Sequence, residues 1–273
     1  PAISPDGKTI AFSYQGDLWR VDANGGTATL LTTSDAYEYA PVWSHDGKWL
    51  AFASDRHGNA DVFIMPSTGG PAMRLTENSA MDVPSDFTPD DKAVLFASGR
   101  VGDVDDRQFP SGAFPQLYSV SVTGGEAIRV LTTTALNARY DPSGTHIAYT
   151  DNKGYENLYR KHHTSTVTRD IWSYDLTTKQ YSKIGSFIGE DRDPVYSADG
   201  KTIYYLSEES GSFNIYKMAA AGGASTAVTH LDKDPIRYLS MSKDDLICFA
   251  FRGILYTVRD GGQPQPLMVT TAV

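Results

Sequence analysis

The feature that most constrains the fold is a turn motif that recurs six times along the chain. Its clearest copy is Ser4-Pro5-Asp6-Gly7-Lys8, and successive copies lie roughly 40 to 56 residues apart. The later copies are centred on Asp46, Asp90, Ser143, Asp199 and Asp244. Internal repeats of about 40 to 50 residues are typical of stacked or radially arranged supersecondary units, and in β proteins of propeller blades.

Each repeat contains short segments suited to β-strands, joined by tight turns. In the first repeat, Ile10-Ala11-Phe12 and Asp17-Leu18-Trp19 are followed by a Gly25-Gly26 turn and a segment that ends in Leu31-Thr32. Asp-Gly and Gly-Gly turns favour hairpins because such turns need positive φ angles. The sequence therefore predicts an all-β fold, a six-bladed β-propeller with four antiparallel strands in each blade.

We expect a single propeller domain over residues 1–273. Its blades are expected at about 1–36, 37–80, 81–135, 136–188, 189–232 and 233–273. The first residues already belong to the innermost strand of blade one, and Val273 follows the outermost strand of blade six. We therefore expect a ring without a strand-exchange clasp, or one that is closed by sequence outside these residues. The chain opens with Pro1 rather than Met, so we expect it to be a processed or excised piece of a longer chain.

The charge balance excludes two classes of partner. The chain carries 24 Lys and Arg residues against 33 Asp and Glu residues, a formal net charge of −9, with no basic run longer than Arg160-Lys161. Such a chain lacks the electrostatic attraction that nucleic acids and anionic lipids require. No apolar run approaches the roughly 20 residues that span a bilayer, so no membrane insertion is expected.

The sequence carries no recognisable catalytic or cofactor motif. Neither a Gly-x-Ser-x-Gly elbow nor a His-Glu-x-x-His motif occurs, and Gly7-Lys8-Thr9 lacks the earlier glycine of a phosphate-binding loop. The single cysteine, Cys248, excludes an internal disulfide and lies in an apolar segment, where an inert thiol is expected. The six histidines are spread over both faces of the predicted ring. We expect no catalytic residue, no metal and no cofactor.

Two long loops mark one face of the ring as the candidate binding face. With the strands of each blade lettered A to D from the axis outward, the A–B and C–D turns lie on one face, here called the turn face. The B–C loops and D–A connections lie on the other, the loop face. The B–C loops lengthen to about residues 99–115 in blade three and 152–168 in blade four. Long loops on a rigid scaffold often carry function.

These loops supply the first set of candidate binding residues. The blade-three loop is acidic with two arginines and the blade-four loop is basic, so adjacent blades present opposite charge on one face. The candidates are basic and aromatic residues of the two loops. The members of the set are Arg107, Phe109, Phe114, Tyr155, Arg160, Lys161, His162, His163 and Arg169. Two interpretations remain open: the loops pair with each other, or they form a rim that recognises a charged peptide or a neighbouring domain.

A second set lies where the innermost strands begin, at the loop-face entrance to the axis. These positions are rich in charge, which is unusual for a packed core and suits a hydrated channel. The candidates are Tyr37, Glu38, Asp82, Arg139, Asp191, Arg192, Asp193 and Arg237. They either pair around the axis and stop the blades from slipping, or line a channel for peptides. In both cases we expect a polar axis.

Several stretches resemble known families. The Ser-Pro-Asp-Gly-Lys, Gly-Gly and Leu-Thr repeats resemble those of TolB-type propellers. A more specific resemblance is to the amino-terminal six-bladed propeller of tricorn-type serine peptidases. The stretches that carry it are Tyr39-Ala40-Pro41-Val42-Trp43-Ser44, Ser54-Asp55-Arg56-His57-Gly58-Asn59-Ala60-Asp61 with Arg74-Leu75-Thr76, Arg160-Lys161-His162 with Arg169-Asp170-Ile171-Trp172, and Asp191-Arg192-Asp193-Pro194.

The resemblance implies a function for the whole chain. In tricorn-type peptidases this propeller holds no catalytic residue, and the serine machinery lies in later domains. The chain is then a non-catalytic module that gates or binds peptides or unfolded polypeptide and docks to other domains of a serine peptidase. One alternative is a TolB-like interaction propeller with no peptidase context, and another is a metal-dependent propeller lyase, which needs a histidine cluster on one face. The resemblance favours periplasmic export over a cytoplasmic location, while the sequence itself leaves the compartment open.

Overall fold

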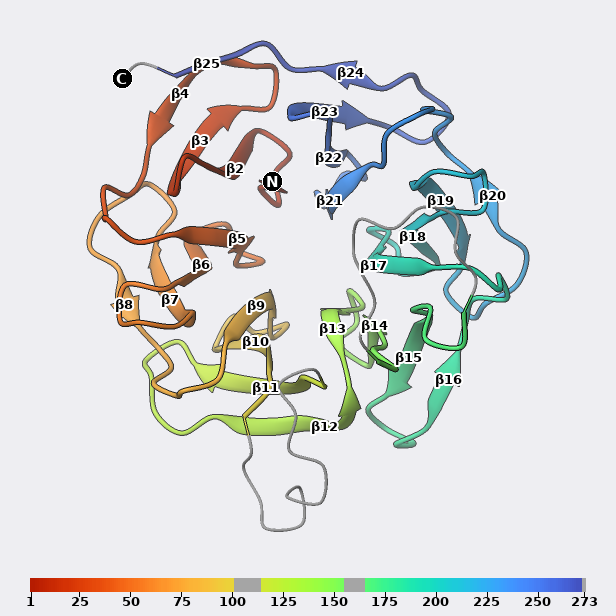
Figure 1. Cartoon of the computed structure of the whole chain (residues 1–273), viewed down its shortest axis with the longest axis horizontal. Helices are drawn as coiled ribbons and strands as arrows, with labels where there is room; N and C mark the ends of the chain where they lie inside the picture. The colour runs from red at the N-terminus through yellow and green to blue at the C-terminus, as the bar shows by residue number, and fades with distance from the viewer. Residues whose placement is uncertain (101–113, 155–164, 272–273) are drawn as a thin grey trace.

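The computed structural model describes residues 1–100, 114–154 and 165–271. In these residues every regular element is a β-strand, and the strands form six sheets arranged around a common axis (Figure 1). Each sheet contains four antiparallel strands drawn from consecutive sequence, which confirms the predicted six-bladed propeller.

The first three blades contain the following strands, in the order A to D. Blade one has β1 (Ala2–Ile3), β2 (Thr9–Tyr14), β3 (Asp17–Asp22) and β4 (Gly26–Leu30). Blade two has β5 (Glu38–Trp43), β6 (Trp49–Ser54), β7 (Asp61–Pro66) and β8 (Met73–Arg74). Blade three has β9 (Asp82–Phe87), β10 (Ala93–Ser98), β11 (Gln116–Ser121) and β12 (Ile128–Thr134).

The remaining blades follow the same order. Blade four has β13 (Leu136–Tyr140), β14 (His146–Thr150), β15 (Ile171–Asp175) and β16 (Tyr181–Lys183). Blade five has β17 (Asp191–Tyr196), β18 (Thr202–Ser207), β19 (Asn214–Ala219) and β20 (Thr226–Ala227). Blade six has β21 (Arg237–Met241), β22 (Ile247–Phe251), β23 (Ile254–Val258) and β24 (Gln265–Pro266).

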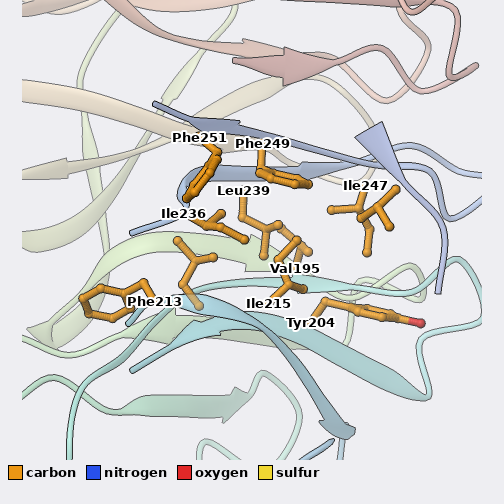
Figure 2. Close-up of a cluster of buried hydrophobic side chains, with 11 residues drawn as sticks. Val195, Tyr204, Phe213, Ile215, Ile236, Leu239, Ile247, Phe249 and Phe251 are labelled. Atoms are coloured by element: carbon orange, nitrogen blue, oxygen red, sulfur yellow. The ribbon is translucent and has the colours of Figure 1, made fainter. Parts of the chain in front are cut away.

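The hydrophobic core lies between neighbouring blades. Figure 2 shows the layer between blades five and six, where Ile215 of β19 packs in one buried cluster with Leu239 of β21 and Phe249 of β22. Burying one apolar side chain of this size stabilises a fold by about 1.5–3 kcal/mol. Each blade is therefore held mainly by the two layers that it shares with its neighbours.

The A–B turns repeat one hydrogen-bonding scheme on the turn face. In blade one, the Ser4 hydroxyl donates to the Asp6 carboxylate over 2.6 Å, and the Lys8 amide donates to the same carboxylate over 3.1 Å. Gly7 takes a φ of 71° in this turn. The side-chain bonds and the glycine explain why this motif specifies the turn.

Two of these turns carry aspartate where others carry glycine. Asp91 of blade three and Asp245 of blade six adopt φ angles of 57° and 60°. Asp91 accepts hydrogen bonds from the backbone amides of His45 and Asp46, at 2.7 and 2.9 Å. Asp245 accepts one from the amide of Ala198 at 2.7 Å. Each carboxylate ties its blade to the turn of the preceding blade, which glycine cannot do.

The ring is closed at the seam between blades six and one. After blade six, β25 (Val269–Thr271) pairs in parallel with β4 and forms a fifth strand on the outer edge of blade one (Figure 1). At the inner strands, the Ile3 amide donates to the Ser240 hydroxyl over 3.1 Å. On the turn face, the Lys243 amide donates to the Pro5 carbonyl oxygen over 2.9 Å.

The expectation of a ring without a strand-exchange clasp is confirmed. Blade one takes its four antiparallel strands from residues 2–30, so no four-stranded blade is completed from both ends of the chain. The closing strand β25 is an addition outside the repeat. Its pairing depends on the backbone edge of β4 and not on a motif that recurs in other blades.

Candidate functional site

Among the described residues, four innermost strands carry a left-handed residue near the loop-face entrance to the axis. Ala40, Asn137, Asp193 and Tyr238 have φ angles of 52°, 49°, 57° and 60°. Each lies within a register shift between strands A and B, four positions before the first residue of the A–B turn. Bulges of this kind re-aim side chains and are frequent beside functional sites.

Two of these side chains are exposed although they lie on innermost strands. Tyr238 is 63% exposed, and Asn137 is exposed as well. The Asn137 side-chain amide donates to the Asp193 carboxylate across the boundary between blades four and five. Polar and aromatic side chains that solvent reaches therefore line this end of the axis.

The axial candidate Glu38 forms a compact cluster with a serine and an arginine of its own blade. Glu38 faces Ser54 across strands A and B of blade two. Arg56 donates from Nε to Ser54 Oγ over 3.1 Å and from Nη2 to the Glu38 carboxylate. The Arg56 guanidinium lies 4.6 Å from the ring centre of Phe63. Glu38 is fully buried, and these contacts replace part of the hydration that its carboxylate loses, since Oε2 has no hydrogen-bond partner among the described residues.

Blade three repeats this arrangement with Asp82. Arg100 donates from Nε to Ser98 Oγ over 3.1 Å and from Nη2 to the Asp82 carboxylate, and its guanidinium lies 4.9 Å from the ring centre of Phe96. Burial raises the pKa of Asp82, and the Ser98 hydrogen bond and the Arg100 charge oppose that shift. Asp82 is fully buried, like its counterpart in blade two.

Blade five has the acid and the serine without the arginine. Asp191 faces Ser207 across β17 and β18, and Glu209 stands at the position of the arginine. Asp191 is 1% exposed. The pKa of Asp191 is raised to about 7, mainly by burial; the hydrogen bond from Ser207 opposes the shift, and the negative charges of Asp170 and Glu209 add to it.

The boundary between blades four and five joins two candidates from different sets. The loop-face candidate Arg169 and the axial candidate Arg192 both contact the Glu190 carboxylate, at 3.0 and 3.5 Å. All three residues are buried. The Arg192 guanidinium also lies 4.0 Å from the ring centre of Phe213. These charges form one internal network between the two blades.

The other axial candidates occupy separate positions. Tyr37 is 55% exposed, and its ring centre lies 5.4 Å from that of Tyr39. Arg139 is half-buried, with Nη1 4.0 Å from the Asp86 carboxylate. Arg237 is half-buried at the start of β21.

Only part of the loop-face set falls within the described residues. Phe114 is 40% exposed just before β11. Seven further candidates lie outside the described residues, namely Arg107, Phe109, Tyr155, Arg160, Lys161, His162 and His163.

The described part of the chain offers little for metal or thiol chemistry. In residues 1–100, 114–154 and 165–271, no group of three or more His, Cys, Asp and Glu side chains is placed to hold a metal ion. Cys248 is fully buried, and burial raises the pKa of its thiol to about 12, so little reactive thiolate forms at neutral pH. Over the same residues, no helix of the length and hydrophobicity needed to cross a membrane occurs.

Several of these site residues escaped the sequence analysis. Asn137, Glu190 and Tyr238 carry no motif that marks them. A signal was available for Arg100, because it follows the last serine of strand B by two positions, as Arg56 does.

Comparison with known proteins places this geometry in a family context. The family model described as the Tricorn protease N-terminal beta propeller domain matches residues 1–263. The solved tricorn protease superposes with a TM-score of 0.80 at 20% identity, covering 97% of this chain and 26% of that chain. TolB from Acinetobacter baumannii superposes with a TM-score of 0.73 at 19% identity, covering 97% of this chain and 68% of that chain. At these identities the superpositions show a shared fold.

A curated peptidase shares a shorter stretch of sequence. Dipeptidyl-peptidase 5 of Porphyromonas gingivalis is 34% identical over 68 residues, which is 21% of this chain and 10% of that enzyme. The chain thus spans a small part of both peptidases that it resembles. Because the family model covers nearly all of its sequence, this propeller belongs to the family of tricorn protease N-terminal beta propeller domains.

Proposed function

We propose that this propeller is a non-catalytic module of a tricorn-like serine peptidase, and that it binds polypeptide substrates at the loop-face entrance to its axis and controls their passage. The observation that carries the proposal is the exposure of Asn137 and Tyr238 at left-handed positions of innermost strands. Aromatic rings beside hydrogen-bonding side chains suit an extended polypeptide, which offers both apolar and polar groups. Family membership supports the peptidase context.

Docking to further domains is the second part of the proposal. The superposed region is 26% of the solved tricorn protease chain, so in that protein the propeller is one part of a larger molecule. A ring with buried ion pairs between blades, such as those of Glu190, is a rigid scaffold on which other domains can be placed.

A binding experiment with a disordered polypeptide tests the axial site. We expect the chain to bind a fluorescently labelled, chemically unfolded polypeptide in an anisotropy titration. Tyr238→Ala combined with Asn137→Ala is expected to weaken binding by about fivefold or more. Tyr181→Ala is the matched control, because Tyr181 is 40% exposed on the outer strand β16 (Figure 1).

Two results contradict the proposal. If the axial double variant and the control bind the polypeptide equally well, the polypeptide does not bind at the axial site. If the chain itself hydrolyses the polypeptide, it is not a non-catalytic module.

A further inference from the structure

Three blades share one arrangement at the loop-face end of strands A to C. In each, an acid that opens strand A faces a serine that closes strand B, and two aromatic rings face each other on strands B and C. The acid and serine pairs are Glu38 with Ser54, Asp82 with Ser98, and Asp191 with Ser207. The ring pairs are Phe52 with Phe63, Phe96 with Tyr118, and Tyr205 with Tyr216, with centres 5.8, 5.9 and 6.3 Å apart.

An arginine completes the arrangement in blades two and three. The Arg56 guanidinium lies 5.9 and 4.6 Å from the two ring centres of blade two, and that of Arg100 lies 4.9 and 5.2 Å from those of blade three. Each guanidinium also binds the acid and the serine of its blade. A carboxylate, a hydroxyl and aromatic faces together match the charge, donors and plane of this group. Both blades therefore contain a guanidinium site filled by the chain's own arginine.

Blade five has Glu209 at the arginine position and the same backbone arrangement. The Glu209 amide donates to Ser207 Oγ over 3.2 Å, as the Arg100 amide donates to Ser98 Oγ over 3.2 Å. The Glu209 carboxylate accepts a hydrogen bond from the Ser225 hydroxyl at 2.9 Å. Blade five thus keeps the acid, the serine and the rings. At the position where the other two blades have an arginine, it has a glutamate.

The Asp191 carboxylate is buried without the cation that its counterparts have. Asp191 is 1% exposed, and its Oδ1 has no hydrogen-bond partner in the described part of the chain. Glu38 Oε2 and Asp82 Oδ1 also lack one, so blade five differs from the other two blades in the missing cation. Among the charged groups that act on it, Asp170 and Glu209 repel a negative charge, and Lys183 attracts it but contacts Asp170 at 2.8 Å. Burial is the main cause that raises the pKa of Asp191 to about 7, so the carboxyl group is partly protonated at neutral pH.

A glycine packs closely beside this carboxylate. A Cβ built on Gly185 would lie 3.0 Å from Asp191 Oδ2 and 4.0 Å from Met218 Cε. Gly185 belongs to the D–A connection that leads from blade four to blade five on the loop face. Ile188 of the same connection is 78% exposed. Any larger residue at position 185 would press on the carboxylate that the site needs.

We propose that blade five binds the guanidinium group of an arginine side chain from a bound polypeptide, in the place that the chain's own arginines occupy in blades two and three. The ligand donates to the Asp191 carboxylate and the Ser207 hydroxyl, and its plane lies over Tyr205 and Tyr216. Binding favours the ionised carboxylate, and the proton leaves to solvent. A guanidinium suits the site better than an ammonium because it donates two coplanar hydrogen bonds and stacks on rings. Only the polypeptide nature of the ligand rests on the proposed function.

A titration of the full chain with N-acetyl-arginine amide tests this site. N-acetyl-citrulline amide is the control ligand, because it has nearly the same shape without the charge. The pKa of the Asp191 carboxyl, followed by carbon-13 NMR, is the readout. We expect saturating arginine amide to lower this pKa by at least about one unit, which corresponds to about tenfold tighter binding of the ligand to the ionised carboxylate than to the protonated one. Citrulline amide should leave the pKa unchanged. Asp191→Asn is expected to abolish the shifts that arginine amide causes in the ring signals of Tyr205.

Substitutions at Glu209 test whether blade five accepts a guanidinium where blades two and three hold theirs. Glu209→Arg is expected to lower the pKa of Asp191, raise Tm and remove the response to arginine amide. Glu209→Gln removes the negative charge without adding a cation, and it is expected to keep that response. In blade three, Arg100→Ala opens a second site of the same kind, and its lowered Tm is expected to recover with arginine amide but not with citrulline amide.

Two outcomes overturn the proposal. One is an equal effect of the two ligands on the pKa of Asp191, and the other is an equal effect of Glu209→Arg and Glu209→Gln on that pKa. Neither outcome bears on the axial site, which the Tyr238 and Asn137 variants test separately. A failure of polypeptide binding at the axis likewise leaves the response to arginine amide intact.

Discussion

Gly25 lies directly against the backbone of Met268, where the closing strand β25 approaches blade one. A Cβ built on Gly25 would come within 2.7 Å of the Met268 carbonyl oxygen, and the Gly26 amide donates to that oxygen over 2.8 Å. Gly124 begins the corresponding turn of blade three with a φ of 81°, and a Cβ there meets nothing within 4 Å. The need for glycine at position 25 therefore comes from the closing strand as well as from the turn.

Gly25→Ala is expected to loosen β25, whereas Gly124→Ala is not. Both variants place alanine at a positive φ, which costs about 1 kcal/mol, but only the first adds a methyl group against Met268. We expect amide hydrogen exchange at Gly26 to accelerate about tenfold or more in Gly25→Ala. Its rate should be unchanged in Gly124→Ala. Equal rates in the two variants would mean that the closing strand tolerates a side chain at this contact.

Asp191→Asn is expected to change the dependence of stability on pH. The pKa of Asp191 is raised to about 7 in the folded chain and is about 4 for an unfolded aspartate. Between these values the unfolded state loses the proton first, so the Asp191 contribution to stability falls as pH rises, by on the order of 4 kcal/mol in total. The stability of the variant relative to wild type should therefore increase between pH 4 and pH 7 and stay constant above pH 7.

Urea unfolding at several pH values checks this, with Asp199→Asn as the control. Hydrogen bonds from the Lys201 amide and the Ser197 hydroxyl lower the pKa of Asp199, so this group is ionised in both states above pH 5. Its variant should show no such trend. If the free energies of unfolding of the two variants change in parallel with pH, the pKa of Asp191 is not raised in the folded chain.

Arg100→Ala is expected to destabilise the chain by about 3–5 kcal/mol, because it leaves the Asp82 carboxylate buried without a counter-charge. Adding Asp82→Asn should recover a large part of the loss, so the two effects are not additive. The same double-mutant cycle can be measured on Arg259 and Asp244, an ion pair in which both side chains are about half exposed. There we expect a coupling free energy below about 1 kcal/mol. Additive effects in blade three would show that the buried pair is not coupled.

Asp91→Asn is expected to cost more stability than Asp245→Asn. Asp91 uses both carboxylate oxygens to accept amide hydrogen bonds from the preceding blade, whereas Asp245 uses one oxygen. Asparagine keeps one acceptor oxygen and tolerates a positive φ. We expect a loss of about 1–2 kcal/mol for Asp91→Asn and less than about 1 kcal/mol for Asp245→Asn. Urea midpoints measure both, and equal losses would contradict the role given to the second oxygen.

The fold was predictable because its signals are local. The turn at Asp6 and Gly7 is specified by residues within five positions of each other, and the same chemistry recurs in each blade. The closing strand was not predictable in this way. Val269–Thr271 is β-branched throughout and suits a strand, but three such residues do not identify a partner, and the partner is an edge at the other end of the sequence.

The candidate site was predictable only in part, because its geometry depends on cross-strand register. The charge of Glu38, Asp82 and Asp191 at the start of innermost strands was visible in the sequence. That an arginine binds Glu38 and Asp82, while Asp191 has none, became clear only when the strands were paired. The left-handed conformation of Tyr238 could not be foreseen either, since a bulky residue rarely adopts a positive φ without tertiary contacts that impose it.

The parallel pairing of β25 with β4 also sets an order of assembly. Thr27 and Thr270, whose hydroxyls lie 3.3 Å apart across this pair, are separated by 243 positions in the chain. A ribosome must therefore make all six blades before the outer edge of the first can be covered. Throughout that time the edge of β4 stays open to other strands, including those of neighbouring nascent chains. The strand that follows blade six thus protects the first blade from misassembly.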